Sequence, residues 1–400
     1  MKFEKERHVQ YFAYCLQSLP APYSALDTNR LTLVHFAVQS LDLLGVFHND
    51  NLLTSSLRIS KDAIIEWIYS LYTRVDTANS CYNAHVGFKG GTFLGPPMDS
   101  KGGEKKSDYV GWEYDHGHIA MTYTALATLA TLGDDLSRID EQSILEGIKG
   151  LQRDDGSFQC ISVGSEHDMR FLYCACAISS MLHNWSAINI PAATSYITSC
   201  KSYDGAFALI PGQEGHGGST FCAVASLKLM GQLEHVLIRD RTWFWSLVRW
   251  CVARQIKGMQ GRPNKNEDTC YSYWIGGVLS LLLQANASFE NNSSNSNNND
   301  GEQQSVSDHL LDLTSLKEYV LSCQTDMGGF SKTFGAAPDL LHSFYSLAWL
   351  SLSNSYNHNI HDDTDGDNDD RDNISLRQLD CALGIPLDRT AIFQKVFTAP

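Results

Sequence analysis

The sequence predicts an all-α fold built from repeated helical hairpins, an α/α toroid of the α6/α6 barrel type. Two recurring motifs carry this prediction. The first is a turn in which Gly precedes an aromatic residue, seen as DDGSF at 154–158, YDGAF at 203–207 and DMGGF at 326–330. The second is an apolar run centred on an aromatic residue, and such runs start near residues 118, 169, 218, 270 and 341. Self-similarity at a fixed period is typical of repeat architectures.

The spacing of the apolar runs gives the period of the repeat. Their central aromatics are separated by 50, 48, 52 and 72 residues and are Tyr123, Tyr173, Phe221, Tyr273 and Tyr345. The last interval contains NNSSNSNNND, a polar low-complexity stretch that has no capacity to pack a core. We therefore predict a single domain over residues 1–400 with disordered inserts at 286–308 and, in an acidic run, at 354–373.

Each repeat is predicted to contain two helices. The apolar runs show helical spacing and are rich in Leu, Ala and Met, which is typical of buried inner helices. Second helical segments lie between them, at 136–152, 191–199, 242–255 and 313–323. Five or six stacked hairpins could close into a ring with the apolar runs inside, although an open solenoid has the same period.

Alignment of the repeats brings three potential metal ligands together. Cys270 and His342 both stand three residues before the central aromatic of consecutive repeats, and Asp268 lies two residues before Cys270. On residue types alone, the three could be a helix cap, a buried thiol and a surface imidazole. A carboxylate, a thiolate and an imidazole that converge leave a fourth tetrahedral position open, which is typical of a catalytic zinc. We predict one zinc ion at this place.

Positive side chains and hydrogen-bond donors gather near the same helix starts. Arg262, Lys265 and Tyr271 lie in GRPNKNEDTCYSYW, His216 lies in GHGGST and Arg170 lies in DMRFLYC. Most Lys and Arg residues are solvated surface charges, but cations beside a metal suit a phosphate or carboxylate group. Because the chain carries a net charge of −15, a local basic pocket indicates a small anionic substrate rather than nucleic acid.

At these residues the chain resembles the β subunits of type I protein geranylgeranyltransferases, in the CaaX prenyltransferase family. The resemblance runs from about Arg7 to Leu352 and rests on RLTLVHFAVQSLDLL, DDLSRID, GSEHDMRFLYCA, HGGSTFCAVASL, GRPNKNEDTCYSYW, and GGFSK with PDLLHSFY. It implies zinc-dependent transfer of a geranylgeranyl group from geranylgeranyl diphosphate to the cysteine of C-terminal CaaX motifs, preferably those that end in Leu.

The resemblance also implies roles for single residues. Asp268, Cys270 and His342 match the zinc ligands, and the substrate cysteine takes the open position. Lys332 matches a catalytic lysine that replaces the magnesium-binding Asp of farnesyltransferase, so we expect that Mg²⁺ is not required. The isoprenoid diphosphate is expected to bind at His216, Arg262, Lys265 and Tyr271, with Arg170 at the same mouth.

Three residues are expected to line the lipid pocket. Thr32 matches a small residue that deepens the pocket, where farnesyltransferase has a Trp. Trp274 is a candidate wall residue on an inner helix, although an aromatic on a helix is commonly plain core. Tyr345 stands where the family would have a Phe, and its hydroxyl needs a partner.

The resemblance implies a heterodimer with a prenyltransferase α subunit and CaaX substrates such as Rho/Rac/Rap-type small GTPases. Two alternatives stay open: a β subunit of farnesyltransferase or of the Rab-type relative, and a toroid that binds prenyl groups or proteins without turnover. Thr32 and Lys332 argue against farnesyltransferase. The complete zinc and diphosphate sets argue against a non-catalytic toroid.

Composition predicts a cytoplasmic protein. No apolar stretch approaches the roughly 18 residues of a membrane span, and MKFEKERHVQ does not have the pattern of a signal peptide. The 11 Cys residues are odd in number and dispersed, which favours reduced thiols over a disulfide framework.

Overall fold

The computed structural model describes residues 1–48, 56–73, 86–92, 116–293, 310–358 and 374–397. Packing divides the chain into two compact units. Unit 1 comprises Met1–Tyr11, Leu43–Gly45 and Ile197–Pro386. Unit 2 comprises Phe12–Asp42, Val46–Tyr196 and Leu387–Pro400. The single domain expected from the sequence stays a prediction.

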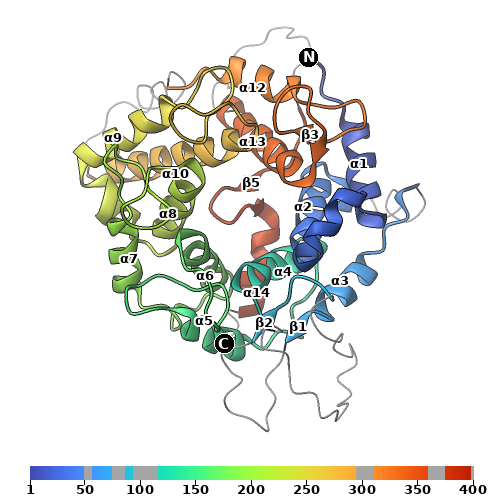
Figure 1. The fold of residues 1–400 in the computed structure, drawn as a ribbon, viewed down its shortest axis with the longest axis horizontal. Helices are drawn as coiled ribbons and strands as arrows, with labels where there is room; N and C mark the ends of the chain where they lie inside the picture. Colours follow the sequence, from blue (N-terminus) through green and yellow to red (C-terminus); the bar gives the residue numbers. More distant parts are fainter. Residues whose placement is uncertain (49–55, 74–85, 93–115, 294–309, 359–373, 398–400) are drawn as a thin grey trace. The chain divides into compact units, whose positions relative to one another are not determined.

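Unit 1 is built around three inner helices, α8 (Gly217–Leu229), α10 (Cys270–Ser293) and α13 (Leu340–His358). Helix α10 contacts both α8 and α13 (Figure 1). The remaining elements of the unit are η5 (Glu234–Ile238), α9 (Arg241–Val252), α12 (Leu313–Ser322), and the antiparallel pairs β3 (Phe330–Ser331) with β4 (Pro338–Asp339) and β5 (Leu379–Asp380) with β6 (Ile385–Pro386).

Unit 2 packs two inner helices together, α4 (Ile119–Leu132) and α6 (Met169–Met181). Its other elements are η1 (Ala21–Asn29), α2 (Arg30–Leu43), η2 (Val46–His48), α3 (Lys61–Tyr69), α5 (Glu141–Leu151), η6 (Leu387–Thr390), α14 (Ala391–Phe397) and the pair β1 (Tyr72–Thr73) with β2 (Gly87–Phe88). Three of the helices described cross the unit boundary: α1 (Lys5–Gln17), α7 (Ile190–Ser199) and, by its last residue Leu43, α2.

The predicted helices are present, with two boundaries wrong: α9 ends at Val252 and not at 255, and α5 starts late. The apolar runs are α4, α6, α8, α10 and α13, and the second segments are α5, α7, α9 and α12. Helix α5 begins at Glu141 and not at 136, because Leu136 has a left-handed φ of 56° and its N–H donates to Asp134 Oδ1 at 2.9 Å. Asp140 caps the helix by accepting from the Ser143 N–H at 3.1 Å.

The repeat register is confirmed inside each unit. In unit 2 the rings of Tyr123 and Tyr173 make an edge contact with centroids 5.7 Å apart. In unit 1 the ring of Tyr273 lies 5.3 Å from Phe221 and 5.3 Å from Tyr345. The aromatics that centre consecutive apolar runs therefore contact one another, as equivalent positions in stacked hairpins should.

The Gly turns of the repeat require glycine. Gly156, Gly205 and Gly328 have φ values of 88°, 94° and 81°, in the left-handed region that favours glycine. A Cβ on Gly328 would also lie 2.1 Å from the Arg7 carbonyl oxygen. Each turn delivers a fully buried aromatic to the core, namely Phe158, Phe207 and Phe330.

The first residues of both segments predicted to be disordered are helical instead. Residues 286–293 continue α10 and residues 354–358 continue α13, while 294–308 and 359–373 lie outside the described residues. Arg241 of α9 supports the extension of α10, because it contacts Asn286 and pairs with Glu290 at 3.6 Å. This ion pair holds a polar segment in a helix. Within the part of the chain that the structure describes, every helix is too short or too polar to cross a bilayer.

Candidate active site

A side chain at the same position of the repeat caps four of the inner helices. Five residues before each central aromatic, one side chain accepts a hydrogen bond from the backbone N–H two residues further on. The acceptors are His118, Asp168, His216 and Asp268, at 3.1, 2.9, 3.1 and 3.0 Å. Caps of this kind satisfy donors that a helix start leaves unpaired. This position therefore has a structural task before any chemical one.

In unit 1 one of these caps, Asp268, belongs to a potential metal site. The ligand atoms of Asp268, Cys270 and His342 all lie within 4.8 Å of one another. His342 Nε2 is 3.2 Å from Asp268 Oδ1. Thr269, between the first two, donates its N–H to the Lys332 carbonyl at 3.0 Å, which ties the start of α10 to the residue that follows β3. The prediction that Cys270 and His342 are neighbours is confirmed.

Asp339 is the residue of this site that sequence reasoning missed. Its Oδ2 lies 2.6 Å from His342 Nδ1, and its Oδ1 accepts the His342 backbone N–H at 2.9 Å. A histidine that binds metal usually donates its other ring N–H to a carboxylate, which fixes the tautomer and the ring orientation. An Asp three residues before a His at a helix start was the signal in the sequence, but the repeat alignment placed Leu340 at the capping position instead.

The pKa values show how the three side chains interact without a metal. Burial opposes ionisation of Asp268, but hydrogen bonds from His342 and Cys270 outweigh it and lower its pKa. Burial and the charge of Asp268 raise the pKa of Cys270 well above its usual value near 9. Burial lowers the pKa of His342, yet its hydrogen bonds to Asp268 and Asp339 raise it to about 9.

The donor set fits zinc. One oxygen, one sulfur and one nitrogen are ligand types that zinc accepts in tetrahedral sites, and three protein ligands leave a position for a substrate atom. The carboxylate of Asp339 behind the imidazole supplies the outer hydrogen bond that such sites have. The raised pKa values keep protons on Cys270 and His342, and zinc would displace these two protons.

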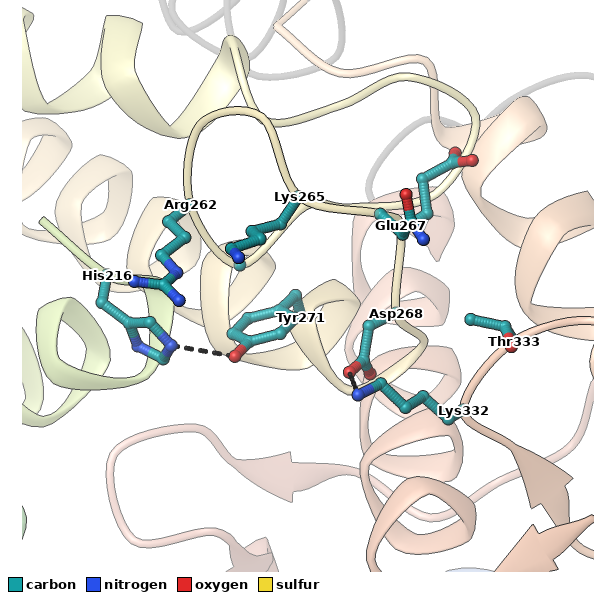
Figure 2. Close-up of a pocket in the computed structure, with 10 residues that line it drawn as sticks. His216, Arg262, Lys265, Glu267, Asp268, Tyr271, Lys332 and Thr333 are labelled. Carbon is teal, nitrogen blue, oxygen red and sulfur yellow. Dashed lines mark hydrogen bonds and ion pairs between the residues drawn. The ribbon is translucent and has the colours of Figure 1, made fainter. Parts of the chain in front are cut away.

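A cavity of about 520 Å³ opens beside this cluster, in unit 1 (Figure 2). Its lining includes most of the cations predicted for an anionic substrate. The lining residues are His216, Gly261, Arg262, Lys265, Asn266, Glu267, Asp268, Tyr271, Lys332 and Thr333. Figure 2 shows Arg262 and Lys265 extending from one loop on the same side as His216 and Tyr271. Asp268 belongs both to the cavity lining and to the potential metal site, so the two are adjacent.

Lys332 links the cavity to the three potential metal ligands. Its Nζ lies 3.6 Å from Asp268 Oδ2, and its side chain is 61% exposed (Figure 2). An ammonium group on a flexible stem at this place can contact an anion in the cavity without leaving the carboxylate. Lys332 therefore puts a positive charge at the side of the cavity nearest the metal ligands.

His216 and Tyr271 form a directed hydrogen-bond pair. His216 Nδ1 accepts the Gly218 N–H at 3.1 Å, so in neutral His216 the proton is on Nε2. Burial lowers the pKa of His216, which favours this neutral form. Nε2 lies 2.9 Å from the Tyr271 hydroxyl and donates to it. The phenol keeps its own proton, because burial and the charges of Cys270 and Asp268 raise its pKa, and it can donate this proton to an anion in the cavity.

The ring of Tyr271 is positioned by Gly261. A Cβ on Gly261 would lie only 2.2 Å from Tyr271 Cζ, so no other residue fits there without displacing the ring. The Gly261 carbonyl accepts the Gly217 N–H at 2.8 Å. This bond joins the loop that carries Arg262 and Lys265 to the start of α8.

Arg170 and Thr32, also predicted for the site, both lie in unit 2. The guanidinium of Arg170 donates to Asp168 Oδ2 at 2.6 Å and to Glu166 Oε2 at 3.0 Å. Hydrogen bonds to Asp168 raise its pKa further, so it is always charged. Thr32 lies on α2, and its hydroxyl donates to Met121 Sδ at 3.4 Å. Neither residue lines the cavity described above, so their roles toward diphosphate and lipid stay predictions.

Trp274 and Tyr345, predicted for the lipid pocket, belong to one aromatic cluster in unit 1. Their ring centroids are 4.2 Å apart, and Trp274 makes an edge contact with Phe221 at 5.0 Å. Both side chains are only partly buried. Such a cluster on α8, α10 and α13 offers an apolar wall, and its role toward a lipid stays a prediction.

Known proteins resemble this chain over most of its length. The family model for the prenyltransferase alpha-alpha toroid domain matches residues 3–385. The geranylgeranyl transferase type-1 subunit beta of Arabidopsis thaliana is 38% identical over 361 residues, which cover 88% of this chain and 85% of the relative. The protein of the same name from Dictyostelium discoideum is 36% identical, with 88% and 91% covered. A protein farnesyltransferase subunit beta from Schizosaccharomyces pombe is 26% identical, with 90% and 80% covered.

A solved structure has the same fold. It is described as Candida albicans protein geranylgeranyltransferase-I complexed with GGPP, and it matches with a TM-score of 0.71 at 22% identity. The match covers 99% of this chain and 100% of that chain. Together with the family model, this likeness confirms the predicted α/α toroid fold.

Proposed function

Because the chain belongs to the prenyltransferase alpha-alpha toroid family, and within it to the type-1 geranylgeranyl transferase β subunits, we propose a specific reaction for it. The chain is a prenyl transferase. In our proposal it transfers a geranylgeranyl group from geranylgeranyl diphosphate to the cysteine thiol of proteins that end in a CaaX motif, with Leu preferred at the last position.

One observation carries the proposal. A cluster that can bind zinc, Asp268, Cys270 and His342, shares a residue with a cavity lined by cations. The reaction needs these two features together. A thiol must be held as a nucleophile, and a diphosphate must be held as a leaving group a short distance away.

The thiol side of the reaction depends on the cluster. When bound by these three residues, zinc would lower the pKa of the acceptor cysteine, so that the thiol is deprotonated near neutral pH. Asp339 orients the imidazole of His342 through the 2.6 Å contact at Nδ1. The reaction therefore needs no side chain of this site to act as a general base.

The diphosphate side depends on the cavity. The acceptor sulfur forms a bond to the allylic C1 of the donor, and the C1–O bond breaks with its electron pair going to the diphosphate. Arg262, Lys265 and Lys332 offer positive charge to the departing oxygens. Tyr271, held by His216, donates a hydrogen bond. Donors placed in advance where charge develops usually make the largest contribution to catalysis.

Two finer features belong to the same proposal. Lys332 supplies charge that would otherwise come from Mg²⁺, so turnover should not require magnesium. The aromatic cluster of Trp274 and Tyr345 forms part of the wall for the lipid chain, and Thr32 leaves room for its end.

The proposed partners are an α subunit, in a heterodimer, and CaaX proteins such as Rho/Rac/Rap-type small GTPases. Support for the heterodimer comes from the relatives, which are named as subunits. We also propose a cytoplasmic location. The cysteines of the described residues are all free, which suits a reducing compartment.

The proposal can be tested by a transfer assay on the full chain, purified with an α subunit and zinc in magnesium-free buffer. We expect transfer from geranylgeranyl diphosphate to a peptide that ends in Leu, and much less from farnesyl diphosphate to a peptide that ends in Ser. Cys270→Ala should abolish transfer and stoichiometric zinc, while Cys251→Ala, at a buried thiol of α9 outside the site, should retain both.

Each alternative predicts another outcome. Preference for the farnesyl donor would support the farnesyltransferase reading. Binding of lipid without any transfer would support the non-catalytic toroid. A strict need for Mg²⁺ would contradict only the role proposed for Lys332 and not the rest of the proposal.

A further inference from the structure

One cation of the cavity is bound to an acidic side chain that does not line the cavity. A guanidinium nitrogen of Arg262 forms an ion pair with the carboxylate of Glu214. Arg262 lines the cavity and Glu214 does not. The two side chains are 36% and 53% exposed, respectively.

Backbone contacts hold this pair in place. Glu214 stands two residues before His216, the cap of α8, and Arg262 follows Gly261. The Gly217 N–H donates to the Gly261 carbonyl at 2.8 Å, so the two loops are tied together beside the ion pair. The tertiary structure therefore places Glu214 and Arg262 within reach of each other.

The two lysines of the cavity differ from Arg262 in their ionic partners. Lys332 pairs with Asp268, which itself lines the cavity. For Lys265 the described residues show no ion pair. Arg262 is thus the cavity cation whose charge is directed to a carboxylate outside the cavity.

We propose that Glu214 is a positioning residue that keeps Arg262 at the edge of the cavity and competes with the diphosphate for its guanidinium. This inference rests on the proposed function, because it concerns the diphosphate of that reaction. A guanidinium presents a fixed fork of donors to one bidentate anion at a time. The diphosphate must displace Glu214 to engage this fork fully, and Glu214 recovers Arg262 when pyrophosphate leaves.

Competition is favoured over simple support by charge and by exposure. Glu214 is an anion beside the place where another anion has to bind, so it repels that ligand as well as occupying Arg262. Because more than half of its side chain is exposed, Glu214 can turn into solvent at little cost. The contact therefore weakens diphosphate binding and speeds product release.

The test uses inorganic pyrophosphate as the probe and the full chain purified with its α subunit and zinc. Glu214→Gln should bind pyrophosphate about two to five times more tightly by calorimetry, which is the strength of a half-exposed ion pair. Glu234→Gln is the matched control, since it removes one charge from another exposed ion pair of unit 1, with Arg239 at 2.8 Å. Its affinity should stay that of the wild type.

Two further readouts separate competition from a general effect of charge or structure. In an Arg262→Gln background, Glu214→Gln should tighten binding less than it does in the wild type, because the competition for Arg262 is gone and only the direct repulsion by Glu214 is removed. In steady state, Glu214→Gln should lower KM for geranylgeranyl diphosphate and strengthen inhibition by pyrophosphate. Glu234→Gln should change neither of these quantities.

Weaker or unchanged pyrophosphate binding in Glu214→Gln would overturn the inference, and so would equal tightening by Glu234→Gln. If the wild type binds pyrophosphate and Glu214→Gln binds it equally well, the inference about Glu214 fails but the proposed function stays intact. A wild-type chain that binds no pyrophosphate contradicts the diphosphate cavity itself, and with it the proposed function.

Discussion

Asp339→Asn is expected to change the number of protons that leave when zinc binds. Hydrogen bonds to Asp268 and Asp339, acting against burial, raise the pKa of His342 to about 9, and burial raises that of Cys270 well above its usual value. Both groups must lose a proton to serve as ligands. At pH 7.5 the wild-type chain should therefore release about two protons for each zinc ion bound.

The magnitude follows from the pKa of His342. A pH of 7 is about two units below that pKa. Loss of the His342 proton at pH 7 therefore costs about 3 kcal/mol and lowers zinc affinity about 100-fold. Below pH 9, affinity should rise about 100-fold for each pH unit, since two protons compete with the metal. An amide at position 339 carries no charge, so the pKa of His342 falls below its wild-type value and fewer than two protons leave at pH 7.5.

The same substitution has a second effect, which pH separates from the first. At pH 9 proton competition at His342 is small in both proteins, and the weakened hydrogen bond behind the imidazole should then lower zinc affinity by about 10- to 100-fold. At pH 7 the easier loss of the proton offsets part of this decrease. The difference between wild type and variant should therefore grow as the pH rises.

Calorimetry in buffers of different ionisation enthalpy counts the protons, and competition with a chelator between pH 6.5 and 9 gives the affinities. Asp326→Asn is the control, because Asp326 is fully exposed, lies in the same unit and pairs only loosely with Arg7 at 3.6 Å. Release of one proton or fewer by the wild type would refute the reasoning. Two protons from the Asp339 variant would refute the part assigned to that carboxylate.

Two further substitutions test the cavity and the lipid pocket. Gly261→Ala should displace the ring of Tyr271, destabilise the fold by about 1–3 kcal/mol and slow transfer about 100-fold, the scale of one lost donor. Gly218→Ala, whose Cβ would come no closer than 3.4 Å to His216, should leave both near wild type, and equal losses in the two variants would contradict the model of Tyr271. Thr32→Trp should shift donor preference toward farnesyl diphosphate by at least about tenfold in a competition assay, whereas Thr32→Ser should not. An unchanged preference in the Trp variant would remove Thr32 from the lipid pocket.

The helical repeat and its register could be read from the sequence because they depend on local patterns. Apolar spacing predicted the inner helices, and alignment on their aromatics predicted that Tyr273 and Tyr345 lie in equivalent places, which the 5.3 Å ring contact confirms. The same alignment put Cys270 beside His342. Residues at equal positions in stacked hairpins become neighbours, so a one-dimensional pattern was sufficient here.

The bounds of elements were less predictable where hydrogen bonds or ion pairs decide them. Helix α5 starts at Glu141 because Leu136 turns left-handed against Asp134. Helix α10 runs through a polar stretch to Ser293, where Arg241 of another helix supports it through Glu290. Composition describes a segment by itself, but these bounds depend on what lies next to it.

The sequence by itself determined the ligand types, their register and the cations that accompany them. Only the tertiary structure decided which partner each group has. Asp339 behind His342, Gly261 against Tyr271 and the pairing of Glu214 with Arg262 are all contacts outside the alignment of the repeats. Glu214 and Arg262 lie 48 residues apart in loops, and loop conformation follows from packing, for which a helical period carries no information.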